Sequence, residues 1–124
     1  MKNESRISYI ELLPNNLVRV EVKKDIELEP EDLDENFKIY KSLLGDQKGL
    51  FLIVFHEGGQ SNAETRAKFA NNERAAIKQA EALVINNLAH RIESNFYKNV
   101  TRPDHPVEVF TEEQSAKEWL LDIK

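Results

Sequence analysis

Apolar and polar residues alternate in the first part of the chain. Valines stand at every second position of residues 18–22 with charged residues between them, which is the pattern of a strand with one buried face. The preceding stretch SYIELL, residues 8–13, also has the composition of a strand. Asn15-Asn16 lies between the two segments, and asparagine tolerates the left-handed backbone of a tight turn. We therefore predict an N-terminal antiparallel hairpin.

Three segments carry apolar residues at the spacing of three and four that gives a helix one apolar face. They are residues 30–44, 88–100 and 111–123. Pro30 suits the first position of a helix, and Gly45 suits its end. The repeating positions are Leu33, Phe37, Tyr40 and Leu44; then Leu88, Ile92, Phe96 and Val100; then Ala116, Trp119, Leu120 and Ile123. In the last helix we expect Trp119 to pack into the core beside Leu120.

Residues 50–55 are apolar at every position, so both faces of this segment should be covered. We predict a central strand with helices on both sides. Residues 80–85 and 107–110 are predicted as further strands, and residues 61–78 as helical with a break at Asn71-Asn72. Strands that alternate with helices favour a parallel sheet with right-handed crossovers. The predicted class is α/β, with a mixed, mostly parallel sheet and an antiparallel hairpin at its N-terminal edge.

Composition narrows the class of protein. A length of 124 residues favours one domain, residues 1–124, with residues 1–6 as a flexible N-terminal tail. The chain has no cysteine, which excludes disulfides and thiol catalysis and fits a reducing compartment. The polar start argues against a secretory signal, and the lack of a long apolar run argues against a membrane span. We therefore expect a cytoplasmic protein. Lysine and arginine number 17 against 22 acidic residues, without a basic cluster, which argues against nucleic-acid binding.

The polar residues match no known metal-binding or catalytic motif in their spacing. The histidines are His56, His90 and His105. His90 and Glu93 can share a helix face, but two ligands make a poor metal site. The acidic segment 25–36 lacks the glycine and glutamate that a calcium loop needs at its sixth and twelfth positions. Ser61 is outside a Gly-x-Ser-x-Gly elbow, and the adjacent glycines form no phosphate-binding loop. We predict no metal, no cofactor and no enzymatic activity.

The loop after the central strand is the first candidate site. Ser61 and Glu64 have the spacing of a capping box, so the serine hydroxyl can cap the following helix. The loop also leaves the carboxyl end of a central strand, where open α/β sheets bind ligands, and a helix start attracts anions. Both interpretations, a structural cap and a partner surface, stay open. The candidate residues are His56, Glu57, Gly58, Gly59, Ser61 and Asn62.

A second candidate lies on the helix predicted over residues 88–100. Arg91 and Asn95 are one turn apart and can face the same partner. A polar stripe beside Phe96 is typical of a modest protein interface. The alternative is a solvated face with local pairs.

The order of elements, with segments such as NNLVRVEV, GLFLIVF and AETRAKFA, resembles the STAS domain. Anti-sigma-factor antagonists have this domain, and the order also resembles the related SpoIIAA-like and Sec14-like small bacterial proteins. The resemblance covers nearly all of residues 8–121 and is closest to uncharacterised single-domain members. In the antagonists, a helix after the central strand begins with Asp-Ser-Ser/Thr-Gly, and its serine or threonine is phosphorylated. Ser61 lies near that place, in the sequence Gly59-Gln60-Ser61-Asn62, which has neither the aspartate nor the following glycine.

The resemblance implies a binding or regulatory role. Our preferred hypothesis is a non-enzymatic, STAS-like regulatory module that binds a protein partner, with a homodimer as a possible form. The alternative is a Sec14-like carrier or sensor of a small apolar or amphipathic ligand. A carrier requires a pocket of about 300 Å³ or more, which makes a cavity the feature that discriminates the two.

Overall fold

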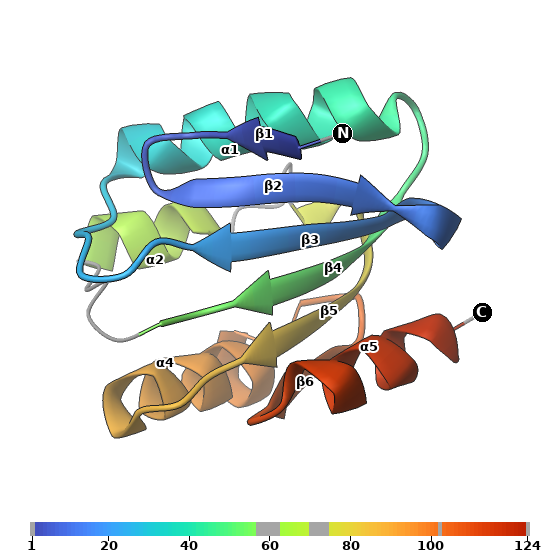
Figure 1. Cartoon of the computed structure of the whole chain (residues 1–124). Coiled ribbons are helices and arrows are strands. Elements are labelled where there is room, and N and C mark those ends of the chain that lie inside the picture. Colours follow the sequence, from blue (N-terminus) through green and yellow to red (C-terminus); the bar gives the residue numbers. More distant parts are fainter. Residues whose placement is uncertain (1, 57–62, 70–74, 102, 124) are drawn as a thin grey trace.

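The computed structural model describes residues 2–56, 63–69, 75–101 and 103–123. One mixed sheet with helices packed around it makes up the molecule (Figure 1). The elements are β1 (Lys2–Glu4), β2 (Ser8–Leu13), the short helix η1 (Pro14–Asn16), β3 (Leu17–Val22), α1 (Pro30–Leu44), β4 (Gly49–Val54), α2 (Ala63–Phe69), β5 (Lys78–Val84), α4 (Leu88–Phe96), the π-helical turn η2 (Tyr97–Thr101), β6 (Val107–Phe110) and α5 (Glu113–Leu121).

The six strands lie in the sheet in the order in which they occur in the chain, from β1 to β6. β2 runs antiparallel to both of its neighbours, β1 and β3, whereas β3, β4, β5 and β6 run parallel. Parallel neighbours need a crossover connection, and helices supply it between the later strands. The structure therefore confirms a mixed, mostly parallel sheet with an antiparallel hairpin at its N-terminal edge.

The turn of this hairpin forms where the sequence predicts it. Asn15 and Asn16 have φ angles of 68° and 56°, the left-handed region that asparagine adopts more readily than most residues. With Pro14 they form the three-residue turn between β2 and β3, so Leu13 pairs with Leu17 and the register continues to Ser8 opposite Val22.

Strand β4 is the interior strand that the apolar run predicts. It pairs with β3 on one side and β5 on the other, and all six of its residues are buried. Phe51 and Ile53 belong to one core, and Leu52 belongs to the core on the opposite face. Both faces of the sheet are covered at this strand, as expected.

Different helices cover the two faces. Side chains of α1 pack on the core that contains Phe51, and α5 packs on the core that contains Leu52. In Figure 1, α5 lies in front of the sheet, while α1 and α2 lie behind it. Leu120 of α5 is fully buried, as predicted, but Trp119 is only partly buried. Trp119 packs against the margin of the same core, with its ring centroid 5.8 Å from that of Phe110, so it contacts the core as predicted but is not enclosed by it.

The structure differs from the sequence prediction at three boundaries. Residues 2–4, expected in a flexible tail, form the edge strand β1 because they pair with β2. Strand β5 begins at Lys78, where the pattern still predicts helix, because residues 78–84 pair with β4. The helix predicted over residues 88–100 is regular only to Phe96, and a π-helical turn follows.

Candidate functional site

The predicted loop site is described only at its first residue. His56 follows β4 at the carboxyl edge of the sheet, and its Nε2 lies 2.9 Å from Oε2 of Glu21. Glu21 is near the end of β3, so the contact joins the ends of two neighbouring parallel strands. The other five candidates, Glu57, Gly58, Gly59, Ser61 and Asn62, lie outside the described residues. The cap and partner-surface interpretations of Ser61 both stay predictions.

Glu21 also connects His56 to helix α5. Arg19 donates to Glu21 over 3.0 Å and to both carboxylate oxygens of Glu113, over 2.6 and 3.0 Å. The hydrogen bonds from His56 and then Arg19 lower the pKa of Glu21, and the hydrogen bond from Arg19 lowers the pKa of Glu113. Because these side chains are partly exposed, the network contributes modestly to stability. Its main effect is to hold His56 beside β3 at this edge.

Arg91 and Asn95 are both exposed on α4, on the side where an apolar row also faces solvent. Leu88, Ile92 and Phe96 form this row, with exposed fractions of 72%, 61% and 59%. An amphipathic helix of a monomeric protein normally buries its apolar stripe. Here α4 instead buries His90 and Ser94 against the domain. We call Leu88, Ile92 and Phe96 the α4 row.

Helix α4 reaches the same edge of the sheet as His56. Asn87 caps it by accepting a hydrogen bond from the backbone N–H of His90 over 2.8 Å. The ring of His90 lies against Phe55, with centroids 5.3 Å apart. Phe55 immediately precedes His56, so the two predicted regions are neighbours in the fold. No described side-chain hydrogen bond or ion pair joins Arg91 or Asn95 to His56.

A buried charge cluster inside the domain escaped the sequence prediction. Glu81 of β5 is 0% exposed and faces the core that contains Phe51. Its Oε1 accepts hydrogen bonds from the Tyr97 hydroxyl over 2.6 Å and from Nε2 of His105 over 2.9 Å. Its Oε2 accepts from the Lys78 ammonium over 2.8 Å. We call these four residues the Glu81 cluster.

Two opposing effects act on the Glu81 carboxyl. Burial raises its pKa, but attraction to Lys78 and the hydrogen bonds from His105, Lys78 and Tyr97 outweigh burial and lower the pKa to about 2. The carboxyl is therefore ionised at neutral pH. Burial, together with the negative charge of Glu81, raises the pKa of Tyr97, which stays a neutral hydrogen-bond donor.

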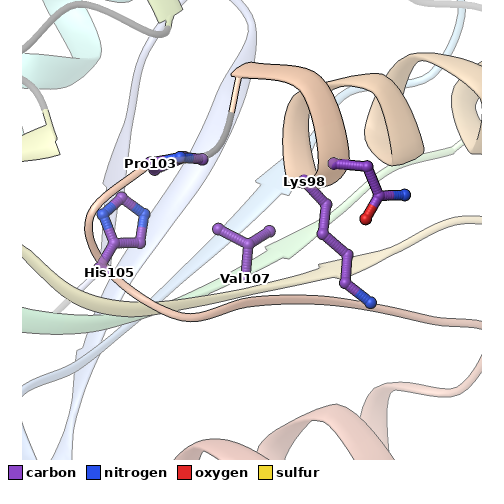
Figure 2. A pocket seen from close by; sticks show the side chains of 5 residues that line it. Lys98, Pro103, His105 and Val107 are labelled. Atoms are coloured by element: carbon purple, nitrogen blue, oxygen red, sulfur yellow. The ribbon is translucent and has the colours of Figure 1, made fainter.

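A pocket opens beside this cluster (Figure 2). Its volume is about 340 Å³, and Lys98, Asn99, Pro103, His105 and Val107 line it. Lys98 and Asn99 come from η2, and Val107 begins β6. His105 contributes to both features, because its ring lines the pocket while its Nε2 holds Glu81. Lys98 also reaches Glu108 of β6 over 2.8 Å.

One signal in the sequence could have revealed the Glu81 cluster. Glu81 stands in the apolar stretch AEALVI, which is predicted as a strand of a sheet covered on both faces. A carboxylate in such a strand needs buried donors. The donors themselves were not predictable by spacing, because Tyr97 and His105 come from segments 16 and 24 residues away.

The described part of the chain has neither a metal-binding cluster nor a membrane-spanning helix. There, no three His, Cys, Asp or Glu side chains gather in a way that could hold a metal ion. Within the same residues, no helix has the length and apolar character needed to cross a membrane.

Comparison with known proteins places the chain in a family. Residues 10–124 match the family described as Domain of unknown function (DUF7793). The chain belongs to this family. No curated protein matches the sequence of this DUF7793 chain.

A solved structure is similar to the DUF7793 chain over nearly its whole length. It is the crystal structure, at 2.25 Å resolution, of an uncharacterized protein from the DUF3478 family with a SpoIIAA-like fold, from Shewanella loihica PV-4. The TM-score is 0.67 at 12% sequence identity, and the match covers 97% of this chain and 98% of the other. At this identity the likeness establishes the fold alone. It confirms the SpoIIAA-like fold that the sequence resemblance implies.

Proposed function

We propose that the protein is a non-enzymatic regulatory module of the STAS-like class that binds another protein through the α4 row. The exposure of Leu88, Ile92 and Phe96 carries this proposal. Three large apolar side chains, each more than half exposed and adjacent on one helix, form a patch of the kind that marks interaction surfaces. Scattered single apolar residues on a surface need no such explanation.

The surroundings of the α4 row suit a protein partner. Arg91 and Asn95 are exposed beside it and supply the polar margin that surrounds the apolar centre of an interface. The row repeats at every fourth residue, which is the spacing by which one helix docks into the groove of another protein. The SpoIIAA-like fold is compatible with this role by analogy only.

The chemistry of the polar side chains supports a role without catalysis. Glu81 is fully buried, so it has no contact with a substrate, and its three hydrogen-bond donors hold it in place. His56 is held by Glu21, which is bound in turn by Arg19. Both arrangements suit structural ion pairs, which also perturb pKa values.

The alternative of an apolar-ligand carrier receives less support. The pocket reaches the volume that a carrier requires, but Lys98, Asn99 and His105 supply much of its lining. A carrier of apolar molecules would instead line its pocket predominantly with aliphatic and aromatic side chains.

Ile92→Glu tests the proposed interface. Because Ile92 is exposed, the variant should keep its free energy of unfolding within about 0.5 kcal/mol of the parent. A charge at the centre of an apolar contact should abolish partner binding. The measurement is photo-crosslinking from position 88 in cells of the source organism, with partners identified by mass spectrometry. Crosslinks to a second copy of the chain would identify a homodimer.

Leu121→Glu is the matched control, since Leu121 is an exposed aliphatic residue on another helix, α5. It should leave the crosslinks from position 88 unchanged. If Ile92→Glu and Leu121→Glu reduce crosslinking equally, the α4 row is not the interface. A loss of stability in Ile92→Glu comparable to that of a core substitution would show that the row is packed in solution.

A further inference from the structure

The pocket beside the Glu81 cluster has the size of a ligand site, and one of its lining side chains, His105, is held in place by Glu81. Its volume of about 340 Å³ lies in the range of small-molecule sites. It adjoins η2, and short π-helical turns occur frequently at functional sites. Figure 2 shows Lys98 on one side and His105 on the other, with Val107 between them.

The polar lining of the pocket selects for negative charge. The ammonium of Lys98 can only donate hydrogen bonds, and the amide of Asn99 has two N–H donors. No carboxylate is present among the described residues that line the pocket. Oxygen atoms of an anion would form charge-assisted hydrogen bonds with Lys98, which are stronger than those between neutral groups.

The hydrogen bond to Glu81 fixes the orientation of the His105 ring, which lines the pocket. Glu81 is ionised and can only accept hydrogen bonds, so Nε2 of His105 carries the proton that joins them. The His105 side chain is nearly buried, and among the described residues its Nδ1 has no hydrogen-bond partner. The negative charge of Glu81 is balanced by Lys78 at 2.8 Å, so the cluster adds little net repulsion toward an anion in the pocket.

The ion pair between Lys98 and Glu108 does not prevent Lys98 from binding a ligand in the pocket. Both side chains are partly exposed, and an ion pair of this kind is weak in water. An ammonium group has three N–H donors, so Lys98 can donate a hydrogen bond to a ligand oxygen whether its ion pair with Glu108 is kept or broken.

We propose that this pocket binds a small oxyanion, the carboxylate or phosphate group of a small molecule, through Lys98 and Asn99 against the ring of His105. The site goes beyond the proposed protein interface and does not depend on it. Lys98 and Asn99 follow the α4 row in the chain but belong to a different surface feature.

Titration with sodium phosphate, and separately with sodium succinate, tests the proposal by following amide and histidine signals in NMR spectra. Saturable shifts should occur at Lys98, Asn99, His105 and Val107. Phosphate-selective or succinate-selective saturation would identify which of the two groups the site prefers. Sodium chloride at matched ionic strength is the control for screening, and it should not reproduce these shifts.

Two substitutions of one ion pair should act in opposite directions. Lys98→Met should weaken anion binding about 10-fold, the order expected when one hydrogen bond to a charged group is lost. Glu108→Gln should tighten it about threefold, because Lys98 then has no competing carboxylate. Both residues are partly exposed, so both variants should fold. Lys41→Met on the exposed side of α1 should have no effect, and neither should Ile92→Glu.

Several results would overturn the proposal. They are the absence of saturation with both anions, equal shifts with sodium chloride, or shifts centred away from the pocket. If Lys98→Met and Glu108→Gln weaken binding alike, the ion pair has only a structural role. A failure of this test leaves the crosslinking result at position 88 unaffected, so the two proposals can fail separately.

Discussion

Replacing Glu81 with alanine is expected to lower the free energy of unfolding by about 3–5 kcal/mol, the range for removing one partner of a buried ion pair. The substitution removes the acceptor of three buried donors, from Lys78, Tyr97 and His105. The substitution would also break the ion pair between Glu81 and the buried Lys78 ammonium. Urea unfolding followed by the fluorescence of Trp119 gives the measurement.

A double variant separates the charge effect from the loss of volume. In Glu81→Leu with Lys78→Met, both charges are replaced by apolar side chains of similar size. Replacing a complete buried pair in this way is often neutral or stabilising, so the part of the loss that comes from the Lys78 charge should return. The part that comes from Tyr97 and His105 should remain, because both donors lack the Glu81 acceptor in either variant. If Glu81→Ala costs less than about 1 kcal/mol, water reaches the carboxylate and the cluster is not buried in solution.

The same cluster predicts how stability depends on pH. The pKa of Glu81 is lowered from its ordinary value of 4.5 to about 2 in the folded protein. Its contribution is therefore present above pH 4.5 and is lost as the pH falls toward 2. Glu21 and Glu113 also have lowered pKa values, so the parent protein loses stability through several groups. Glu81→Gln should flatten this loss in acid unfolding curves, and identical slopes for the two proteins would contradict the prediction.

The elements that the sequence predicts well depend on local patterns. The unbroken apolar run of β4 requires cover on both faces, and Asn15-Asn16 allows the left-handed turn of the hairpin. Strand β1 has no such pattern, because three polar residues become a strand only by pairing with β2. Trp119 has the spacing of a core residue, but α5 turns Ala116 and Leu120 more fully toward the sheet.

The candidate sites depend on tertiary contacts that local sequence patterns do not predict. Spacing identifies the apolar face of α4, but it does not say whether another part of the chain covers that face. The structure leaves the α4 row exposed and buries His90 and Ser94 instead. The Glu81 cluster depends on residues from β5, η2 and the loop before β6, which only the completed fold brings together. The sequence predicts Arg91 and Asn95 as a pair because they are one helix turn apart, which is a local property.

Phe51→Ala is expected to cost about 3–5 kcal/mol, the range for truncating a buried phenylalanine. Phe51 is 0% exposed in the middle of β4. Its ring meets that of Tyr40 edge-on, with centroids 5.0 Å apart, and the Lys78 ammonium lies 5.6 Å from its centroid. The substitution would leave a cavity between α1 and the sheet and would remove an aromatic partner of a buried cation.

The chain supplies a matched control for this prediction in Phe96, which is more than half exposed on α4. Phe96→Ala removes the same atoms but should change the free energy of unfolding by no more than about 0.5 kcal/mol. It should nevertheless reduce the crosslinking of a partner from position 88. Stability and partner binding would then depend on different phenylalanines, because burial determines the first and exposure permits the second. Comparable losses of stability for both variants would mean that α4 packs in solution against something that covers the α4 row.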